Sequence, residues 1–284
     1  MEVKKITIYK HLKINTMKKV FLALAAAAMI FVGCSKDDDK TIDNLAEKII
    51  GKWITTDIDG HAELTNNKSV ITILSASQAL ISTSRANLPD NQGWVSHLNA
   101  SVVIDGNKVT ITGQPNEHIT IVWEITVSSI SDTHMEGTFK HSTLRNGEVI
   151  TTNGPIGMRW EKITTDYEQA VLGKWEGRST GEDSEFDDGE NHRWEYLANG
   201  TFRYYRKVDG TWQLSNDEYA KYFVDGNLLC TCWKNNGAGN EAHREWWEIE
   251  SIENGVMKWK GLRQREDGTT YTATFQMVKV PANK

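Results

Sequence analysis

The side chains best suited to chemistry are scattered along this sequence rather than gathered in motifs. The eight histidines show neither the His-x-His nor the His-Glu-x-x-His spacing that would bring imidazoles together on one metal ion. No serine, histidine and acid stand in a known nucleophile motif, and no glycine-rich phosphate loop precedes a helix. With 38 Asp and Glu residues, paired carboxylates arise by chance. We therefore expect a protein that is not an enzyme and holds no metal or cofactor.

Two of the three cysteines, Cys230 and Cys232, are one residue apart in the stretch LLCTCW. On a strand, such residues point to the same face. Two thiols alone lack the further ligands that zinc takes, and a disulfide across this spacing would be strained. We interpret both residues as buried core thiols.

The third cysteine, Cys34, follows an export-signal pattern. Met17-Lys18-Lys19 is basic, and residues 20–32 (VFLALAAAAMIFV) form an uncharged apolar run of 13 residues. This run is shorter than the roughly 20 residues that span a bilayer. The stretch Phe31-Val32-Gly33-Cys34 resembles the lipobox of bacterial lipoproteins, with Phe31 where that motif usually has Leu. The resemblance implies that residues 1–33 are removed and that Cys34 is acylated.

Residues 34–44 would then tether the protein to a membrane. Ser35 differs from the Asp that retains such lipoproteins in the inner membrane, and Lys36 followed by three aspartates resembles a surface-export signal. The resemblance implies an outer-membrane lipoprotein exposed at the cell surface, with a periplasm-facing protein as the alternative. The net charge of −6 excludes nucleic acid as a partner, because phosphates would be repelled.

A short phrase occurs twice in the sequence, as IIGKW at residues 49–53 and as VLGKW at residues 171–175, with 175 − 53 = 122. VIDGN is answered by FVDGN at an offset of 225 − 105 = 120, and one WEI by another at 247 − 123 = 124. Matches in the same order at a near-constant offset indicate a duplication. The sequence therefore predicts two domains, at residues 45–164 and 165–284.

Each domain has the pattern of sequential β-hairpins. In the second domain, turns are predicted at Asn199-Gly200, Asp209-Gly210, Asp225-Gly226, Asn254-Gly255 and Asp267-Gly268, because such pairs adopt the positive φ values of tight hairpins. Eight or nine antiparallel strands that leave no long exposed edge tend to close into a barrel. We expect an all-β protein with two tandem up-and-down β-barrels, each preceded by a short helical turn.

A helical turn that leads into Gly-x-Trp on the first strand resembles the lipocalin signature, and the second domain also resembles bacterial lipocalin-like lipoproteins. In lipocalins this tryptophan closes one end of the barrel, and a basic residue stacks on it. The resemblance assigns the closing motif to Gly51 and Trp53 in the first domain and to Gly173 and Trp175 in the second. Arg159 is the expected stacking residue of the first domain, whereas the second offers no clear equivalent.

Aromatic residues are concentrated in the second domain, where they could fill the core or line a cavity for an apolar or ring-shaped ligand. The candidate lining residues are Trp194, Tyr196, Phe202, Tyr204, Trp212, Trp247 and Trp259. Adjacent strand residues point to opposite faces, so Trp246 is the candidate exposed aromatic beside Trp247. The acidic segment Gly181–Asn191 corresponds in position to the loop that covers the open end of a lipocalin.

The sequence thus favours a lipoprotein that binds a small apolar or amphipathic molecule in at least the second barrel. The alternative is a surface glycan-binding, adhesion or inhibitor module that works through exposed aromatic residues and loops. The identity of a protein partner stays open.

Overall fold

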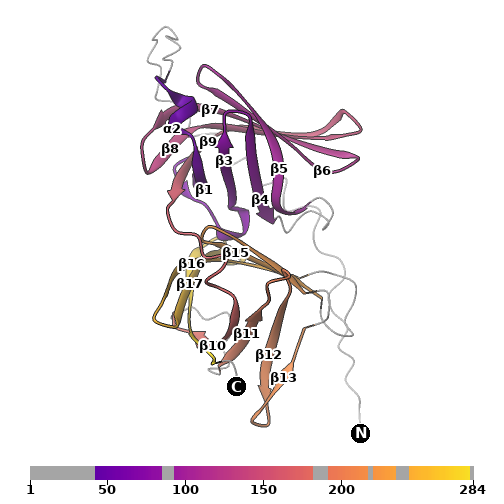
Figure 1. The fold of residues 1–284 in the computed structure, drawn as a ribbon, viewed down its shortest axis with the longest axis vertical. Coiled ribbons are helices and arrows are strands. Elements are labelled where there is room, and N and C mark those ends of the chain that lie inside the picture. The colour runs from indigo at the N-terminus through magenta and orange to yellow at the C-terminus, as the bar shows by residue number, and fades with distance from the viewer. Residues whose placement is uncertain (1–41, 85–92, 182–190, 217–219, 235–242, 282–284) are drawn as a thin grey trace. The chain divides into compact units, whose positions relative to one another are not determined.

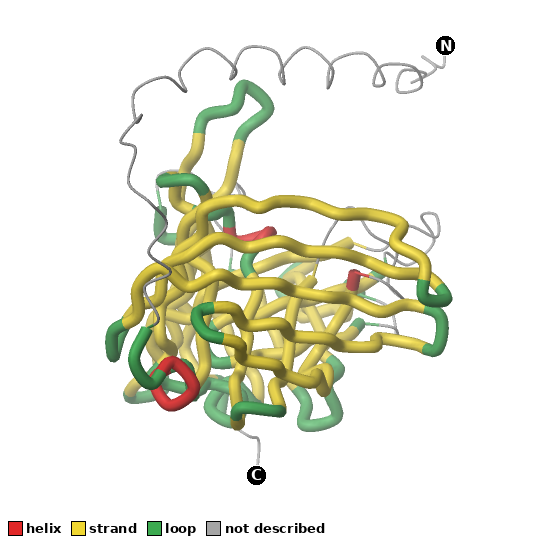
Figure 2. The backbone as a smooth tube through the Cα atoms, turned by 90° about the horizontal axis from the view of Figure 1, so that it is seen from above, coloured by secondary structure: helices red, strands yellow, loops and turns green. Residues whose placement is uncertain are grey.

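The computed structural model describes residues 42–84, 93–181, 191–216, 220–234 and 243–281, and residues 40–284 form one compact unit. Cys34, the apolar run at residues 20–32 and most of the acidic segment Gly181–Asn191 lie outside the described residues. Strands account for most of the described chain, and helix is confined to short segments (Figure 2). Within these residues no helix is both long and apolar enough to cross a membrane.

The first sheet follows a single short helix, α2 (Leu45–Lys48). Its strands are β1 (Gly51–Ile58), β2 (His61–Ala62), β3 (Ser69–Ser75), β4 (Gln78–Ser84), β5 (Trp94–Asp105), β6 (Lys108–Asn116), β7 (Ile119–Ile130), β8 (His134–Arg145) and β9 (Glu148–Ile163), with the 3₁₀ turn η1 (Thr65–Asn67) before β3. Each strand pairs with its neighbours in antiparallel register, and β9 also pairs with β1. Eight strands, β1 and β3 to β9, therefore form a closed barrel (Figure 1).

The second sheet begins directly after the first. Its strands are β10 (Gly173–Ser179), β11 (His192–Tyr196), β12 (Phe202–Val208), β13 (Thr211–Leu214), β14 (Lys221–Asp225), β15 (Leu228–Trp233), β16 (His243–Glu253), β17 (Val256–Gln264) and β18 (Thr270–Lys279). Strands β10 and β18 pair, so the two ends of this domain meet within one sheet. In place of a helix, β10 follows a turn in which the Val171 N–H donates to the carbonyl of Tyr167 at 3.0 Å.

The expected fold class, two tandem antiparallel barrels, is confirmed, with one difference between the domains. The second sheet has β13 and β14 at its two ends, and these strands do not pair with each other. The sheet curls so that an isolated bridge joins Thr201 to Lys221, and the Tyr222 N–H donates to the Gly200 carbonyl at 2.9 Å. Contact between β12 and β14 is thus limited to the start of β12, whereas the first barrel closes along six residue pairs.

Alternation of side chains places one core inside each sheet. Large inward residues are fully buried, among them Trp53, Trp123 and Trp160 in the first barrel and Trp175 and Trp259 in the second. The predicted hairpin turns form with left-handed backbone angles, as at Asn254 (φ 51°) and Gly255 (φ 73°). Burial of these aromatic rings, at roughly 25 cal/mol per Å² of apolar surface, stabilises both barrels.

Candidate functional site

The repeated Gly-x-Trp phrase occupies the same position in both barrels. Trp53 and Trp175 are both 0% exposed. The indole N–H of Trp53 donates to the Ile49 carbonyl at 2.7 Å, and that of Trp175 donates to the Val171 carbonyl, also at 2.7 Å. Each tryptophan therefore ties the preceding turn to the first strand at one end of its barrel.

A lysine from the last strand lies over each of these tryptophans. The Lys162 ammonium is 5.2 Å from the Trp53 ring centroid, and the Lys279 ammonium is 5.1 Å from that of Trp175. The motif glycine makes room for this lysine: a Cβ on Gly51 would lie 2.6 Å from Lys162 Cε. The glycine, the tryptophan and the lysine thus form one cation–π closure in each domain.

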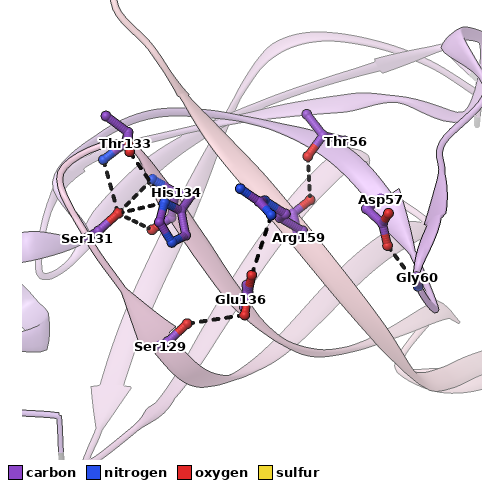
Figure 3. A network of polar contacts seen from close by, with 9 residues as sticks. All are labelled: Thr56, Asp57, Gly60, Ser129, Ser131, Thr133, His134, Glu136 and Arg159. Atoms are coloured by element: carbon purple, nitrogen blue, oxygen red, sulfur yellow. Dashed lines mark hydrogen bonds and ion pairs between the residues drawn. The ribbon is translucent and has the colours of Figure 1, made fainter.

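Arg159 does not stack on Trp53, contrary to what the lipocalin resemblance implies. It alternates with the inward residues Met158 and Trp160 on β9, so its side chain points outward. Its guanidinium is 3.7 Å from the Glu136 carboxylate, and its carbonyl accepts from the Thr56 hydroxyl at 3.3 Å (Figure 3). Lys162 is on the same side of β9 as Met158 and Trp160, and it takes the stacking position over Trp53. In the second domain, Lys279 takes the same position over Trp175. The similar sequences "EKI" and "MVKV" at the ends of the two domains could have identified both lysines.

The second barrel contains a cavity of about 240 Å³. Its lining combines four aromatic residues, two charged residues and two hydroxyl-bearing residues: Trp194, Phe202, Tyr204, Trp233, Arg206, Glu245, Ser215 and Thr231. These side chains come from β11, β12, β15 and β16, and from the segment that follows β13. The cavity therefore offers ring faces together with hydrogen-bond donors and acceptors.

Three of the candidate lining residues, Trp194, Phe202 and Tyr204, line this cavity. Three others, Tyr196, Trp247 and Trp259, are at most 1% exposed and belong to the core of the same barrel. Trp247 and Trp259 stack with ring centroids 5.2 Å apart and planes 13° apart. Sequence reasoning missed Trp233 and the four polar residues of the lining, although alternation along β12 and β16 places Arg206 and Glu245 on the inner face.

Trp212 lies on the outside of the barrel, contrary to the sequence prediction. Trp212 is the cross-strand partner of Lys207, whose side chain is on the outer face of β12. Directly opposed residues of paired strands point to the same face, so Trp212 also points outward. The Arg193 guanidinium lies 4.2 Å from the Trp212 ring centroid. Arg193 precedes the inward-pointing Trp194 on β11, so its own side chain points outward. Trp212 of the short β13 hairpin thus stacks on a half-buried arginine outside the barrel rather than lining the cavity.

Hydrogen bonds fix one wall of the cavity. The Tyr204 hydroxyl is 2.6 Å from His192 Nδ1, and the Tyr204 and His192 rings stack with planes 10° apart. Arg206 Nε donates to the same hydroxyl at 3.2 Å. Behind this wall, the buried Asn216 side chain accepts from the Tyr204 N–H at 2.9 Å and donates to the Phe202 carbonyl at 3.1 Å. The Asn216 side chain thus forms hydrogen bonds with the start of β12, before the residues of β12 that pair with β13.

Trp246 is buried, contrary to its assignment as an exposed aromatic. It points away from the interior of its own barrel, as alternation requires, but it is only 8% exposed. Its indole N–H donates to the Ser84 carbonyl of β4 at 2.7 Å. It belongs to an inter-sheet cluster, which we define as Ile54, Val70, Phe223, Leu228, Cys230 and Trp246. Cys230 is a free thiol in this cluster, and burial raises its pKa.

An ionic group lies beside the inter-sheet cluster. The Lys52 ammonium is 2.5 Å from Asp225 in the β14–β15 hairpin and 2.5 Å from Asp166 between the sheets. The Asp225 side chain is 0% exposed. Burial alone would lower the pKa of Lys52, but the hydrogen bonds that its ammonium donates to the two carboxylates, together with their charges, outweigh burial and raise the pKa. The adjacent Gly226 is tightly packed, since a Cβ there would lie 2.6 Å from Ile163 Cδ1.

The core residue Tyr222 of the second domain should make the protein less stable at alkaline pH. Burial, with a contribution from the charge of Glu168, raises the pKa of Tyr222 to about 12. Because the folded state favours the protonated phenol, this contribution is present in full below about pH 10 and is lost as the pH rises through 12. A shift of two units corresponds to at most about 2–3 kcal/mol, and solvent screening of the half-buried phenol reduces this value. We expect urea unfolding between pH 9 and 11.5 to show this loss, and Tyr222→Phe to reduce it. An equal loss in the variant would contradict the prediction.

In the part of the chain that the structure describes, no three histidine, cysteine or acidic side chains gather in a way that could hold a metal ion.

No protein-family model matches the sequence, and no curated protein is significantly similar to it. Among solved structures, the chain is similar to a transferrin binding protein B double mutant from Haemophilus parasuis, with 10% identity, a TM-score of 0.25, and coverage of 76% of this chain and 54% of that chain. It is also similar to intact Ap transferrin binding protein B with its N and C lobes, with 12% identity, a TM-score of 0.21, and coverage of 75% of this chain and 55% of that chain. The third similar structure is a putative AttH from Nitrosomonas europaea, with 10% identity, a TM-score of 0.23, and coverage of 84% of this chain and 98% of that chain. The chain spans about half the length of the first two proteins. Likenesses this distant do not bear on its function.

Proposed function

We propose that this protein is a lipid-anchored binding protein that holds a small amphipathic ligand in the cavity of its second barrel. The observation that carries the proposal is the cavity of about 240 Å³, whose lining joins aromatic rings to charged and hydroxyl groups. Small-molecule sites combine apolar contact surface with convergent polar groups that orient the ligand, and this lining offers both. We assign the protein binding rather than catalysis, because the sequence contains no recognisable catalytic motif.

Trp233 provides the sharpest test of this site, because Trp212 is available as a matched control. Trp233 lines the cavity and packs edge-on against Phe202 with ring centroids 6.2 Å apart, whereas Trp212 stacks on Arg193 outside the barrel. For a ligand that occupies the cavity, we expect Trp233→Ala to weaken binding by about tenfold or more, since a buried ring contact is worth about 1.5 kcal/mol or more. Isothermal titration calorimetry measures this effect.

Trp212→Ala should leave the ligand affinity unchanged. Equal losses in the two variants, or no loss in Trp233→Ala, would place the ligand outside the cavity. Urea unfolding of both variants shows whether the comparison concerns folded proteins.

The anchor is the second part of the proposal. It is supported by the lipobox-like Phe31–Cys34 stretch, the apolar run before it and the acidic stretch after it. One acyl chain binds a membrane only marginally, so the two or more chains of a bacterial lipoprotein anchor are needed for firm attachment. An outer-membrane location at the cell surface, or facing the periplasm, belongs to the same proposal.

Cys34→Ala should abolish labelling by an alkyne fatty acid and shift the protein from the membrane fraction to the soluble fraction. Both barrels should stay folded, because the described cores lie entirely within residues 45–277. Cys230→Ala is the matched control, since it removes a buried thiol and should leave labelling intact. A Cys34→Ala variant that still takes up label and sediments with membranes would contradict the anchor.

The alternative of glycan binding through exposed aromatic residues loses its leading residue, because Trp246 is buried in the inter-sheet cluster.

A further inference from the structure

We propose that the cavity of the second barrel binds a single neutral sugar ring. This inference rests on the proposed function and specifies the ligand class of the same site. It joins three properties of the lining: the arrangement of the aromatic faces, the balance of the charged groups and the volume.

The aromatic residues of the lining come from two parts of the sheet. Trp194 and Tyr204, from the paired strands β11 and β12, have ring centroids 5.3 Å apart and planes 36° apart. Across the edge of the sheet, Trp233 of β15 stacks on His243 with centroids 5.6 Å apart. A pyranose ring presents a face of C–H groups that packs on aromatic π surfaces. The ring faces of the lining can therefore pack on the C–H groups of a pyranose, while the polar groups of the lining meet its hydroxyls.

The polar residues of the lining suit hydroxyl groups. Arg206 offers only donors, Glu245 offers only acceptors, and the hydroxyls of Ser215 and Thr231 can do either. Adjacent hydroxyls of a sugar both donate and accept, so they can hydrogen-bond to a guanidinium and to a carboxylate in addition to the contacts that these groups already make within the protein, such as the Trp247 indole N–H that donates to Glu245 at 3.3 Å. The two charges are of opposite sign, and an uncharged ligand leaves this balance undisturbed.

Thr231 and Ser215 argue against an acyl chain as the ligand. The methylene groups of an acyl chain would cover both hydroxyls and remove their hydrogen bonds to water without offering new ones. Covering a polar group without a partner costs about 1–3 kcal/mol.

The cavity volume of about 240 Å³ also favours a single sugar ring over an acyl chain. Sites for drug-sized ligands occupy about 300–1,000 Å³, so this cavity suits a smaller molecule. One pyranose ring with its substituents is of that smaller size, whereas a long acyl chain is not.

The wall is also held in place by the protein. The Tyr204 hydroxyl lies between His192 Nδ1 at 2.6 Å and Arg206 Nε at 3.2 Å, which fixes the tyrosine ring and orients the arginine. Side chains that are already ordered lose less conformational freedom when the ligand binds. This matters for a sugar, because each of its hydrogen bonds replaces a bond to water.

The test uses the mature protein from Cys34 to Lys284, with a Cys34→Ala substitution for solubility, and three sets of probes. These are the methyl glycosides of glucose, galactose, mannose and N-acetylglucosamine, then decanoic acid, and then free tryptophan. We expect saturation-transfer NMR and calorimetry to show binding of at least one glycoside. Trp233→Ala should weaken that binding by at least about tenfold, and Trp212→Ala should not.

Two further variants keep the shape of the site. Glu245→Gln exchanges a charged acceptor for a neutral one, and we expect about a tenfold loss of glycoside affinity, the difference between hydrogen bonds to charged and to neutral groups. Thr231→Val removes one hydroxyl and should cost severalfold. If decanoic acid or tryptophan binds with dependence on Trp233 and no glycoside does, the sugar assignment is wrong and the proposed function stands. If no probe of any set binds, or if binding ignores Trp233, the sugar assignment and the binding site both fail.

Discussion

Replacing Trp246 with Ala should destabilise the protein by about 3–5 kcal/mol, the usual cost of truncating a buried tryptophan. Its ring lies in the inter-sheet cluster with Ile54 and Val70 of the first barrel and Phe223 and Leu228 of the second. The substitution also removes the indole N–H that donates to the Ser84 carbonyl at 2.7 Å. Urea-induced unfolding, followed by far-ultraviolet circular dichroism, measures the change in the free energy of unfolding.

Trp212→Ala is the control for this prediction, since it removes a half-buried tryptophan that stacks on the half-buried Arg193 outside the barrel. A cation–π pair is worth about 0.5–1 kcal/mol when exposed and about 2 kcal/mol when desolvated, so this variant should lose about 1–2 kcal/mol. Trp246→Phe should fall between the two, because it keeps an aromatic ring and loses the hydrogen bond. If Trp246→Ala unfolds at the same urea concentration as Trp212→Ala, the inter-sheet cluster does not form in solution.

Asp225→Ala should destabilise the protein by about 3 kcal/mol, the lower end of the cost of removing one partner of a buried ion pair. The Asp225 side chain is fully buried against Lys52, and the lower value applies because Lys52 keeps its contact with Asp166. The matched control is Asp105→Ala, which changes the corresponding aspartate of the duplicated first domain. Asp105 is exposed, so that change should stay within about 0.5 kcal/mol.

A double variant separates the ion pair from the packing of the hairpin. Replacing a buried ion pair with apolar residues is often neutral or stabilising, so Lys52→Met together with Asp225→Leu should recover most of the lost stability. Equal urea midpoints for Asp225→Ala and Asp105→Ala would show that the Lys52–Asp225 contact contributes nothing.

The duplicated aspartates show how far a repeat can be interpreted from sequence. VIDGN and FVDGN are equivalent stretches, and both form hairpin turns after a strand. Only the second turn packs against the other barrel, where Gly226 meets Ile163 and Asp225 meets Lys52. The local phrase determines the turn, but the surroundings of the turn determine whether its aspartate is a solvated surface group or half of a buried ion pair.

For the tryptophans too, the local sequence predicts the face of the strand, whereas the tertiary structure determines what that face contacts. Alternation along β16 predicts that Trp246 and Trp247 face opposite sides, and they do. The outward residue was expected to be exposed because sequence parity says nothing about a second domain that covers the outer face. Trp212 was misplaced because its parity depends on pairing with Lys207, and the short β13 hairpin has too few residues for an alternating pattern.

The sequence by itself determined the duplication, the all-β class, the hairpin turns and the Gly-x-Trp closure, because each of these depends on residues close together in the chain. Tertiary structure decided which cation lies over each tryptophan, where the second sheet closes, and which aromatic and polar side chains meet around the cavity. Those outcomes depend on strand register across the barrel and on contacts between residues more than a hundred positions apart, such as Trp246 and Ser84. Periodicity assigns a side chain to a face, but only the folded chain determines what that face meets.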